Sequence, residues 1–243
     1  GQLLQLLTLR PPKVVAFDLL FTEESQDPDQ DTGFADGLLL HPGAITGASA
    51  DDLGGEGSEA ALIGLTEPIP LKNIEGNVSA LRGEDTALIP VEVVRESSKT
   101  GFVNVEPSRS DGLRRKAPLI VRVGNFVYPS LVLQCLMSGE GIEPDAVKVV
   151  LGDRIELKGE EGEWIIPIDE MGRMWINYRG TDSEGGNDVF EGTGAIVYYG
   201  LLYFLNEYGT RLAGDSDVDW LSHYDTTDGE KVALPGVERQ YLI

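Results

Sequence analysis

The sequence predicts an α/β fold, with a mixed β-sheet flanked by helices and extra β-hairpins in the second half of the chain. Three observations lead to this prediction. An apolar run near the start suits a buried strand, the next expected strands alternate with helices, and the later strands follow one another through turn-rich connections. The 243 residues are enough to bury a substantial core, and we expect one domain over residues 1–243.

The first two expected elements are a helix and a strand. Leu3–Leu7 has the composition of a helix, which Pro11 and Pro12 stop because proline cannot continue one. Lys13–Phe21 is a continuous apolar run with β-branched and aromatic residues, so we expect a strand buried on both faces. Asp18 interrupts this run.

The following segment, residues 22–60, is acidic and rich in Gly, Asp and Ser. Within it we expect a short helix around Gly33–Leu40 and a strand around Ala44–Ala48. Ala50–Ser58 has the composition of a flexible acidic loop.

The remaining elements are more sharply marked. We expect a helix over Leu88–Ser98 that stops at Lys99–Gly101, a turn over Pro107–Gly112, and a helix over Ser130–Met137 opened by Pro129. The strands expected in this half of the chain are Phe102–Glu106, Ala117–Val123, Val147–Leu151, Arg154–Lys158, Trp164–Ile168 and Met174–Tyr178.

The chain is strongly acidic, with 41 Asp and Glu against 19 Lys and Arg and a formal net charge of −22. A field of this sign repels nucleic-acid phosphates and anionic lipid headgroups, so neither is an expected partner. A well-hydrated surface facing an aqueous compartment is the simplest explanation of this charge.

Neither cysteine pairing nor a membrane span is visible in the chain. Cys135 is the only cysteine, and it lies in the apolar run Leu131–Leu136, which we expect to be a buried helix face. No apolar stretch approaches the ~20 residues that cross a bilayer. Because the chain begins at Gly1 rather than Met and runs directly into the first helix, we expect an excised segment.

The sequence lacks the common catalytic signatures. It has no Gly-x-Ser-x-Gly elbow, no phosphate loop and no Gly-x-Gly-x-x-Gly after a strand. Its two histidines, His41 and His223, lie in segments expected to be surface loops, where histidines are usually solvated. We therefore expect no catalytic residue and no cofactor.

Asp18 is the first candidate ligand-binding residue. It resembles the nucleophile of phosphotransferases that place an Asp at the end of a buried strand, but Leu20 occupies the position of the second carboxylate that this chemistry requires. A structural acid is the simpler interpretation. A ligand role stays open because ligands bind at the carboxyl ends of strands in open α/β sheets.

Asp27, Asp29 and Asp31 are weak candidates for a metal site. They alternate as in a calcium loop, but the glycine comes one position late and Leu38 stands where a bidentate Glu is needed. A solvated acidic loop is the simpler interpretation, and we expect no metal.

Three arginines complete the set of candidate ligand-binding residues. Arg114 and Arg115 belong to the dense basic cluster Ser110–Lys116, which either pairs with surrounding carboxylates or anchors an anionic ligand. Arg179 follows the last expected strand and could cap carbonyls, form a salt bridge or reach a ligand.

Several stretches occur together in the order typical of one known family. They are Val14–Phe21, Gly101–Val105, Ser110–Arg115, Ala117–Leu119, Tyr128–Leu131, Ile166–Asp169, Gly172–Met174, Ile176–Gly180, Tyr224–Thr226 and Leu234–Glu238. With these stretches the chain resembles the type-two CHASE domain, the sensory extracellular module associated with cyclases and histidine kinases.

The resemblance implies a sensor on the periplasmic or extracellular side of a bacterial cytoplasmic membrane, within a membrane-embedded protein. The implied output is an adenylate or diguanylate cyclase, a histidine kinase or a Ser/Thr kinase, and the signal is an unknown small molecule or protein. The family's first strand is not seen in this sequence, either because the protein lacks it or because the sequence omits it. If the protein lacks it, an exposed sheet edge would favour pairing with another chain, as in a homodimer. The alternatives are a metal-dependent hydrolase or phosphatase using Asp18, and a structural dimerisation module.

Overall fold

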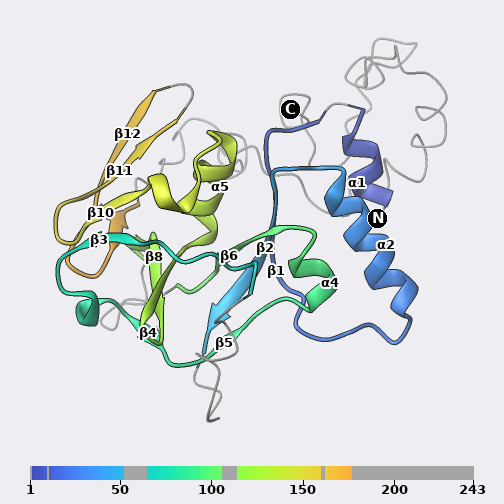
Figure 1. The fold of residues 1–243 in the computed structure, drawn as a ribbon, viewed down its shortest axis with the longest axis horizontal. Coiled ribbons are helices and arrows are strands. Elements are labelled where there is room, and N and C mark those ends of the chain that lie inside the picture. Colours follow the sequence, from blue (N-terminus) through green and yellow to red (C-terminus); the bar gives the residue numbers. More distant parts are fainter. Residues whose placement is uncertain (1, 10, 52–64, 106–113, 160–161, 177–243) are drawn as a thin grey trace, which may run out of the picture. The chain divides into compact units, whose positions relative to one another are not determined.

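A computed structural model describes residues 2–9, 11–51, 65–105, 114–159 and 162–176 (Figure 1). Residues 13–176 form one compact unit, and helix α1 (Gln2–Leu7) lies outside this unit. The predicted mixed α/β class is confirmed, because helices and several separate sheets occur together in the described ranges. The prediction of one domain over residues 1–243 stays a prediction.

The first sheet is mixed and is built around one central strand. Strand β2 (Ala44–Ala50) pairs in parallel with β1 (Val15–Leu20) and β6 (Lys99–Phe102), and antiparallel with β5 (Ala87–Leu88). Every residue of β2 except Ser49 is buried. The carboxyl ends of β2 and β6 therefore lie next to each other in the parallel part of this sheet.

Strand β1 lies at the edge of this sheet, and its predicted burial on both faces is wrong. Within the described residues it pairs only with β2, and four of its six side chains are exposed, including Leu19 at 58%. Phe17 is half-buried and meets Phe34 edge-on, with ring centroids 5.3 Å apart. The expectation that a sheet edge pairs with another chain stays a prediction.

Helix α2 (Pro28–Leu39) is longer than the predicted Gly33–Leu40 because its start is capped. Asp27 is the N-cap, its carboxylate accepting the backbone N–H of Asp29 at 3.2 Å, and proline occupies the first helical turn. Because of this cap, the segment around Asp29 and Asp31, predicted as an acidic loop, is helical.

The predicted helix Leu88–Ser98 is wrong in most of its length. The helix α4 covers only Glu92–Arg95, because Leu88 pairs in β5 and Pro90 interrupts the segment before it. Gly101, predicted as a helix stop, lies in β6. A Cβ at Gly101 would come within 2.6 Å of the Leu131 Cα, so glycine allows helix α5 to pack closely on this strand.

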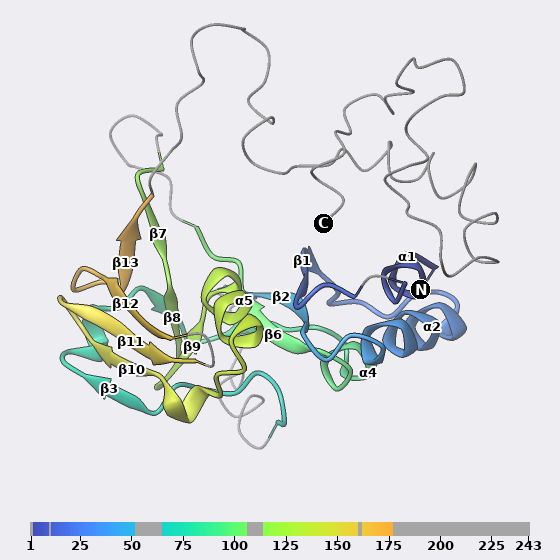
Figure 2. The ribbon, with the colours of Figure 1, turned by 90° about the horizontal axis from the view of Figure 1, so that it is seen from above.

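Helix α5 (Leu131–Gly139) packs on the first sheet and against the larger of two apolar cores. Ser130 caps it by accepting the Leu133 N–H at 3.3 Å, whereas Pro129 ends strand β9 (Phe126–Pro129) and does not open the helix. Figure 2 shows α5 between β1 and β2 on one side and the antiparallel strands on the other. Its Leu133 and Met137 are buried in the larger core.

The hairpins predicted for the second half are confirmed. Strands β10, β11 and β12 form consecutive antiparallel pairs, and β3 joins β10 in parallel. The predicted strand Ala117–Val123 is divided into β7 and β8, and the predicted turn Pro107–Gly112 lies outside the described residues. The remaining elements are β3 (Asn73–Glu75), η1 (Val78–Ala80), β4 (Gly83–Glu84), β7 (Lys116–Pro118), β8 (Ile120–Val123), β9 (Phe126–Pro129), η2 (Pro144–Ala146), β10 (Lys148–Val150), β11 (Arg154–Lys158), β12 (Glu163–Pro167) and β13 (Arg173–Trp175).

Two apolar cores support these strands. The larger lies between α5 and the antiparallel strands and includes Val149 and Ile155, both fully buried. The smaller lies at the carboxyl ends of β2 and β6, where the rings of Phe102 and Tyr128 have centroids 5.2 Å apart. Strand β8 contributes Ile120 to the first core and Val121 to the second, so it joins them.

A candidate ligand cleft

A small cleft opens beyond the carboxyl ends of β2 and β6. It has a volume of about 60 Å³ and is formed by strands of three different sheets. This is the end of a parallel sheet at which α/β proteins bind ligands. Its lining residues are Ala50, Arg82, Gly83, Glu84, Asn104, Val105, Pro118, Ile120, Val121, Met171 and Arg173.

Close approach of two strands shapes one side of the cleft. Gly83 of β4 pairs in parallel with Arg122 of β8, and a Cβ on Gly83 would lie only 2.0 Å from the Arg122 carbonyl oxygen. The Arg122 guanidinium holds the pairing by donating to the carbonyl oxygens of Gly124 at 2.7 Å and Gly83 at 3.4 Å. Only glycine permits β4 to lie this close.

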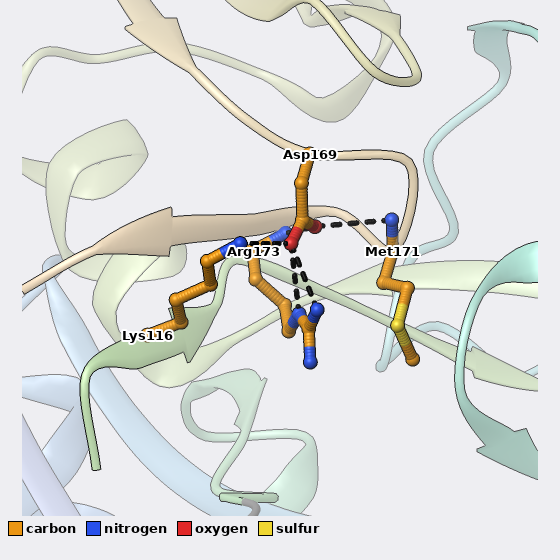
Figure 3. Close-up of polar contacts among 4 residues, drawn as sticks. All are labelled: Lys116, Asp169, Met171 and Arg173. Carbon is orange, nitrogen blue, oxygen red and sulfur yellow. Dashed lines mark hydrogen bonds and ion pairs between the residues drawn. The ribbon is translucent and has the colours of Figure 1, made fainter.

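Another part of the lining is a turn organised by Asp169. One oxygen of its carboxylate, Oδ1, accepts the backbone N–H groups of Met171 and Arg173, both at 3.0 Å. The other, Oδ2, accepts Nε and Nη2 of Arg173 at 3.0 and 2.9 Å, and Nζ of Lys116 at 2.9 Å (Figure 3). The turn that leads into β13 is therefore fixed by one side chain.

The Asp169 carboxylate is held in its ionised form. Burial alone would raise its pKa, but the hydrogen bonds from Arg173 and Lys116 outweigh burial and lower the pKa to about 2. Lys116 also lies over the ring of Trp175, with Nζ 4.6 Å from the ring centroid. Because Lys116 and Trp175 are directly opposite in the β7–β13 pair, the register of these strands sets the contact.

The sequence-predicted ligand residues do not line this cleft. Asp18 is exposed on β1, and Arg114 and Arg115 are exposed just before β7. Arg179 lies outside the described residues. Their binding of a ligand stays a prediction. Lys116, at the end of the same basic cluster, pairs with Asp169, as the ion-pairing alternative expects.

The weak metal candidates have a structural role in α2. Asp27 is its N-cap, Asp29 lies in its first turn, and Asp31 accepts the Ser25 N–H at 2.8 Å. Within the described ranges no three His, Cys, Asp or Glu side chains are grouped so that they could hold a metal. The alternative of a metal-dependent phosphatase built on Asp18 gains no support from this part of the chain.

Two further sequence expectations are corrected. His41 is only 3% exposed and follows α2, so its predicted place in a surface loop is wrong, because the chain turns inward there to begin β2. Cys135 is half-buried on α5 rather than fully buried, and burial raises the pKa of its thiol. His223 lies outside the described residues.

The sequence alone does not single out Asp169, Arg173 or Arg82. The Asp–Arg spacing with Gly172 between them was an available signal, because an acid shortly before a glycine often organises a turn. Arg82 carries no comparable signal, because only the pairing of β4 with β8 brings it to the cleft.

Comparison with known proteins identifies the family of the chain. The CHASE2 domain model matches residues 1–198, well over half of the chain, whereas no curated protein and no solved structure matches significantly. Among the described residues, no helix combines the length and apolar character needed to cross a bilayer. The chain belongs to the CHASE2 family, whose members are extracytoplasmic sensory domains of signalling proteins.

Proposed function

We propose that this chain is the input domain of a bacterial transmembrane signalling protein and that a ligand in the cleft changes its output. The output is a nucleotide cyclase, a histidine kinase or a Ser/Thr kinase inside the cell. Family membership supports the sensory role. The observation that carries the ligand role is the cleft itself, at the carboxyl ends of β2 and β6.

The composition of the cleft suits a sensor. Ala50 comes from the first sheet, Gly83 from the β4–β8–β9 sheet and Arg173 from the β7–β13 pair. A ligand would therefore contact three separately formed sheets. Binding shifts a conformational equilibrium only if affinity differs between the states, and an arrangement of several sheets gives the ligand contacts whose relative position can change.

Cysteine labelling of the membrane-embedded protein in producing cells tests the extracytoplasmic position. Val132 is 61% exposed on α5, so a Val132→Cys variant in a Cys135→Ser background offers one reactive thiol within the described ranges. We expect a membrane-impermeant maleimide to label intact cells. The Leu133→Cys variant is the matched control, because Leu133 is 1% exposed and should not react. Labelling of Val132→Cys only after lysis would contradict the proposal.

A further inference from the structure

Arg173 presents a partly engaged guanidinium to the cleft. Its Nε and Nη2 donate to Asp169, whereas among the described residues Nη1 donates to none. Figure 3 shows this remaining nitrogen pointing away from the Asp169 carboxylate. The side chain is 27% exposed, so a solute can reach it. A guanidinium fixed on one edge is preorganised to donate from its other edge.

The charges around the cleft favour an anion of low charge. Arg82 adds a second guanidinium, exposed at the rim, whereas Glu84 contributes one carboxylate. Asn104 has both ends of its amide engaged, with Nδ2 donating to the Ala50 carbonyl and Oδ1 accepting the Ala50 N–H, each at 2.8 Å. With Lys116 and Asp169 beside the lining included, three cations face the two carboxylates of Glu84 and Asp169. This balance attracts a monoanion more than a neutral molecule, and Glu84 opposes higher charge.

Much of the remaining lining is apolar. A cavity of about 60 Å³ holds several water-sized molecules, since one water needs about 10–15 Å³ of such space. It accommodates a carboxylate and a short hydrocarbon chain rather than a bulky ligand. The apolar residues of the lining, here called the apolar wall, are Val105, Pro118, Ile120, Val121 and Met171.

We propose that the cleft binds the carboxylate of a small aliphatic monocarboxylic acid. The carboxylate accepts from Nη1 of Arg173 and from the guanidinium of Arg82, and the hydrocarbon chain lies against the apolar wall. This inference rests on the proposed sensory function, since it names the class of ligand for the same cleft. A ligand of so few atoms has a dissociation constant on the order of 1 mM.

The methionine methyl groups provide an internal test on the full chain. Of the three methionines, Met171 lines the cleft, Met137 is fully buried and Met174 is half-buried outside the lining. We would titrate methyl-labelled protein with propionate and assign Met171 with a Met171→Leu variant. Increasing propionate should change the chemical shift of the Met171 methyl group until the site is saturated, and it should leave that of Met137 unchanged. Propionamide, which has the same shape without charge, should shift neither.

Three charge variants sharpen the titration. Arg82→Gln should weaken propionate binding about threefold and Glu84→Gln should tighten it about threefold, as expected for partly exposed charges. Arg154→Gln is the matched control, because Arg154 lies on β11 beside Asp153 and Glu156 and should change binding less than twofold.

Each contrary result overturns the inference. Equal shifts with propionamide would show that charge is not recognised, and shifts with inorganic phosphate alone would show the wrong class of anion. No shift of Met171 up to about 50 mM propionate would show that no such site exists. None of these results affects the labelling of Val132→Cys. The titration can therefore reject the monocarboxylate ligand while the labelling still supports the extracytoplasmic sensory role, and the reverse also holds.

Discussion

The regions around Asp169 and Glu67 both enclose a carboxylate, but one favours the ionised form and the other the neutral form. Asp169, 20% exposed, lies among Lys116, Arg173 and two backbone N–H groups. Glu67 lies against β6, where Oε2 accepts the backbone N–H of Thr100 at 3.3 Å. Burial raises the pKa of Glu67 to about 7, although this hydrogen bond and Lys99 lower it.

The difference shows that the balance between donors and burial decides whether a carboxylate stabilises this fold. The pKa of Asp169 lies below its ordinary 3.8, so its contribution is present above about pH 4 and is lost as the pH falls through about 2. The pKa of Glu67 lies above its ordinary 4.5, so its contribution is present below about pH 4.5 and is lost as the pH rises through about 7.

The largest expected effect is that of Asp169→Ala. This change removes both ion pairs and the acceptor for two backbone N–H groups, so the free energy of unfolding should fall by about 3 kcal/mol near neutral pH. Urea denaturation measures it. Asp153→Ala is the control, because Asp153 is 56% exposed beside Arg154 and should change stability by less than about 0.5 kcal/mol. An equal fall in the free energy of unfolding in both variants would contradict a special stabilising role for the Asp169 carboxylate.

The next effect is that of Glu67→Gln, and its sign depends on pH. Near pH 8 the variant should be more stable by about 2 kcal/mol, because it removes a charge whose ionisation burial opposes. Near pH 4 the wild-type side chain is already neutral, and the two proteins should unfold alike. Glu163→Gln, at an exposed position of β12, should show no such pH dependence. A stabilisation that does not change between the two pH values contradicts the assignment.

The elements predicted from sequence are those whose signals are local. The hairpins β10–β12 follow from closely spaced strands with turn-rich connections. Helix α5 follows from its apolar run, although Ser130 rather than the predicted Pro129 caps its start. The prediction that both faces of β1 are buried was wrong. Whether a strand lies at the edge of a sheet depends on which strands pair, and the local sequence does not determine this pairing. The same holds for residues 88–98, where strand pairing and Pro90 override a helical pattern.

The cleft was less predictable than the fold for a related reason. Asp169 and Arg173 are close in sequence, and their turn could have been recognised from Gly172. Arg82, Asn104 and Val121 come from distant segments and meet only through pairing of β4 with β8 and packing at the end of β6. The charge pattern of the sequence instead favoured Arg114 and Arg115 as ligand-binding residues, because they belong to a dense basic cluster.

A smaller effect is expected for Lys116→Met, which separates the contribution of one cation from the rest of the Asp169 region. Methionine keeps much of the side chain beside Trp175 but removes the charge, so stability should fall by about 1 kcal/mol and the pKa of Asp169 should rise toward 3.8. Lys72→Met is a matched control, because Lys72 lies 2.9 Å from Asp145 as Lys116 does from Asp169, but both partners are about two-thirds exposed. If Lys72→Met lost as much stability as Lys116→Met, exposure to solvent would not weaken the Lys72–Asp145 ion pair.

The smallest expected effect lies at the rim of the Glu67 region, where Lys99 and Glu143 act on Glu67 with opposite signs. Lys99 Nζ lies 3.7 Å from Glu143 Oε1, and Glu143 is 69% exposed. Glu143→Gln should lower the pKa of Glu67 and Lys99→Met should raise it, each measured by carboxyl NMR titration. Because solvent and salt screen exposed charges, both shifts should shrink in about 1 M salt, whereas the part caused by burial should persist. A Glu67 pKa that returns to 4.5 in high salt would show that neighbouring charge, and not burial, separates this region from that of Asp169.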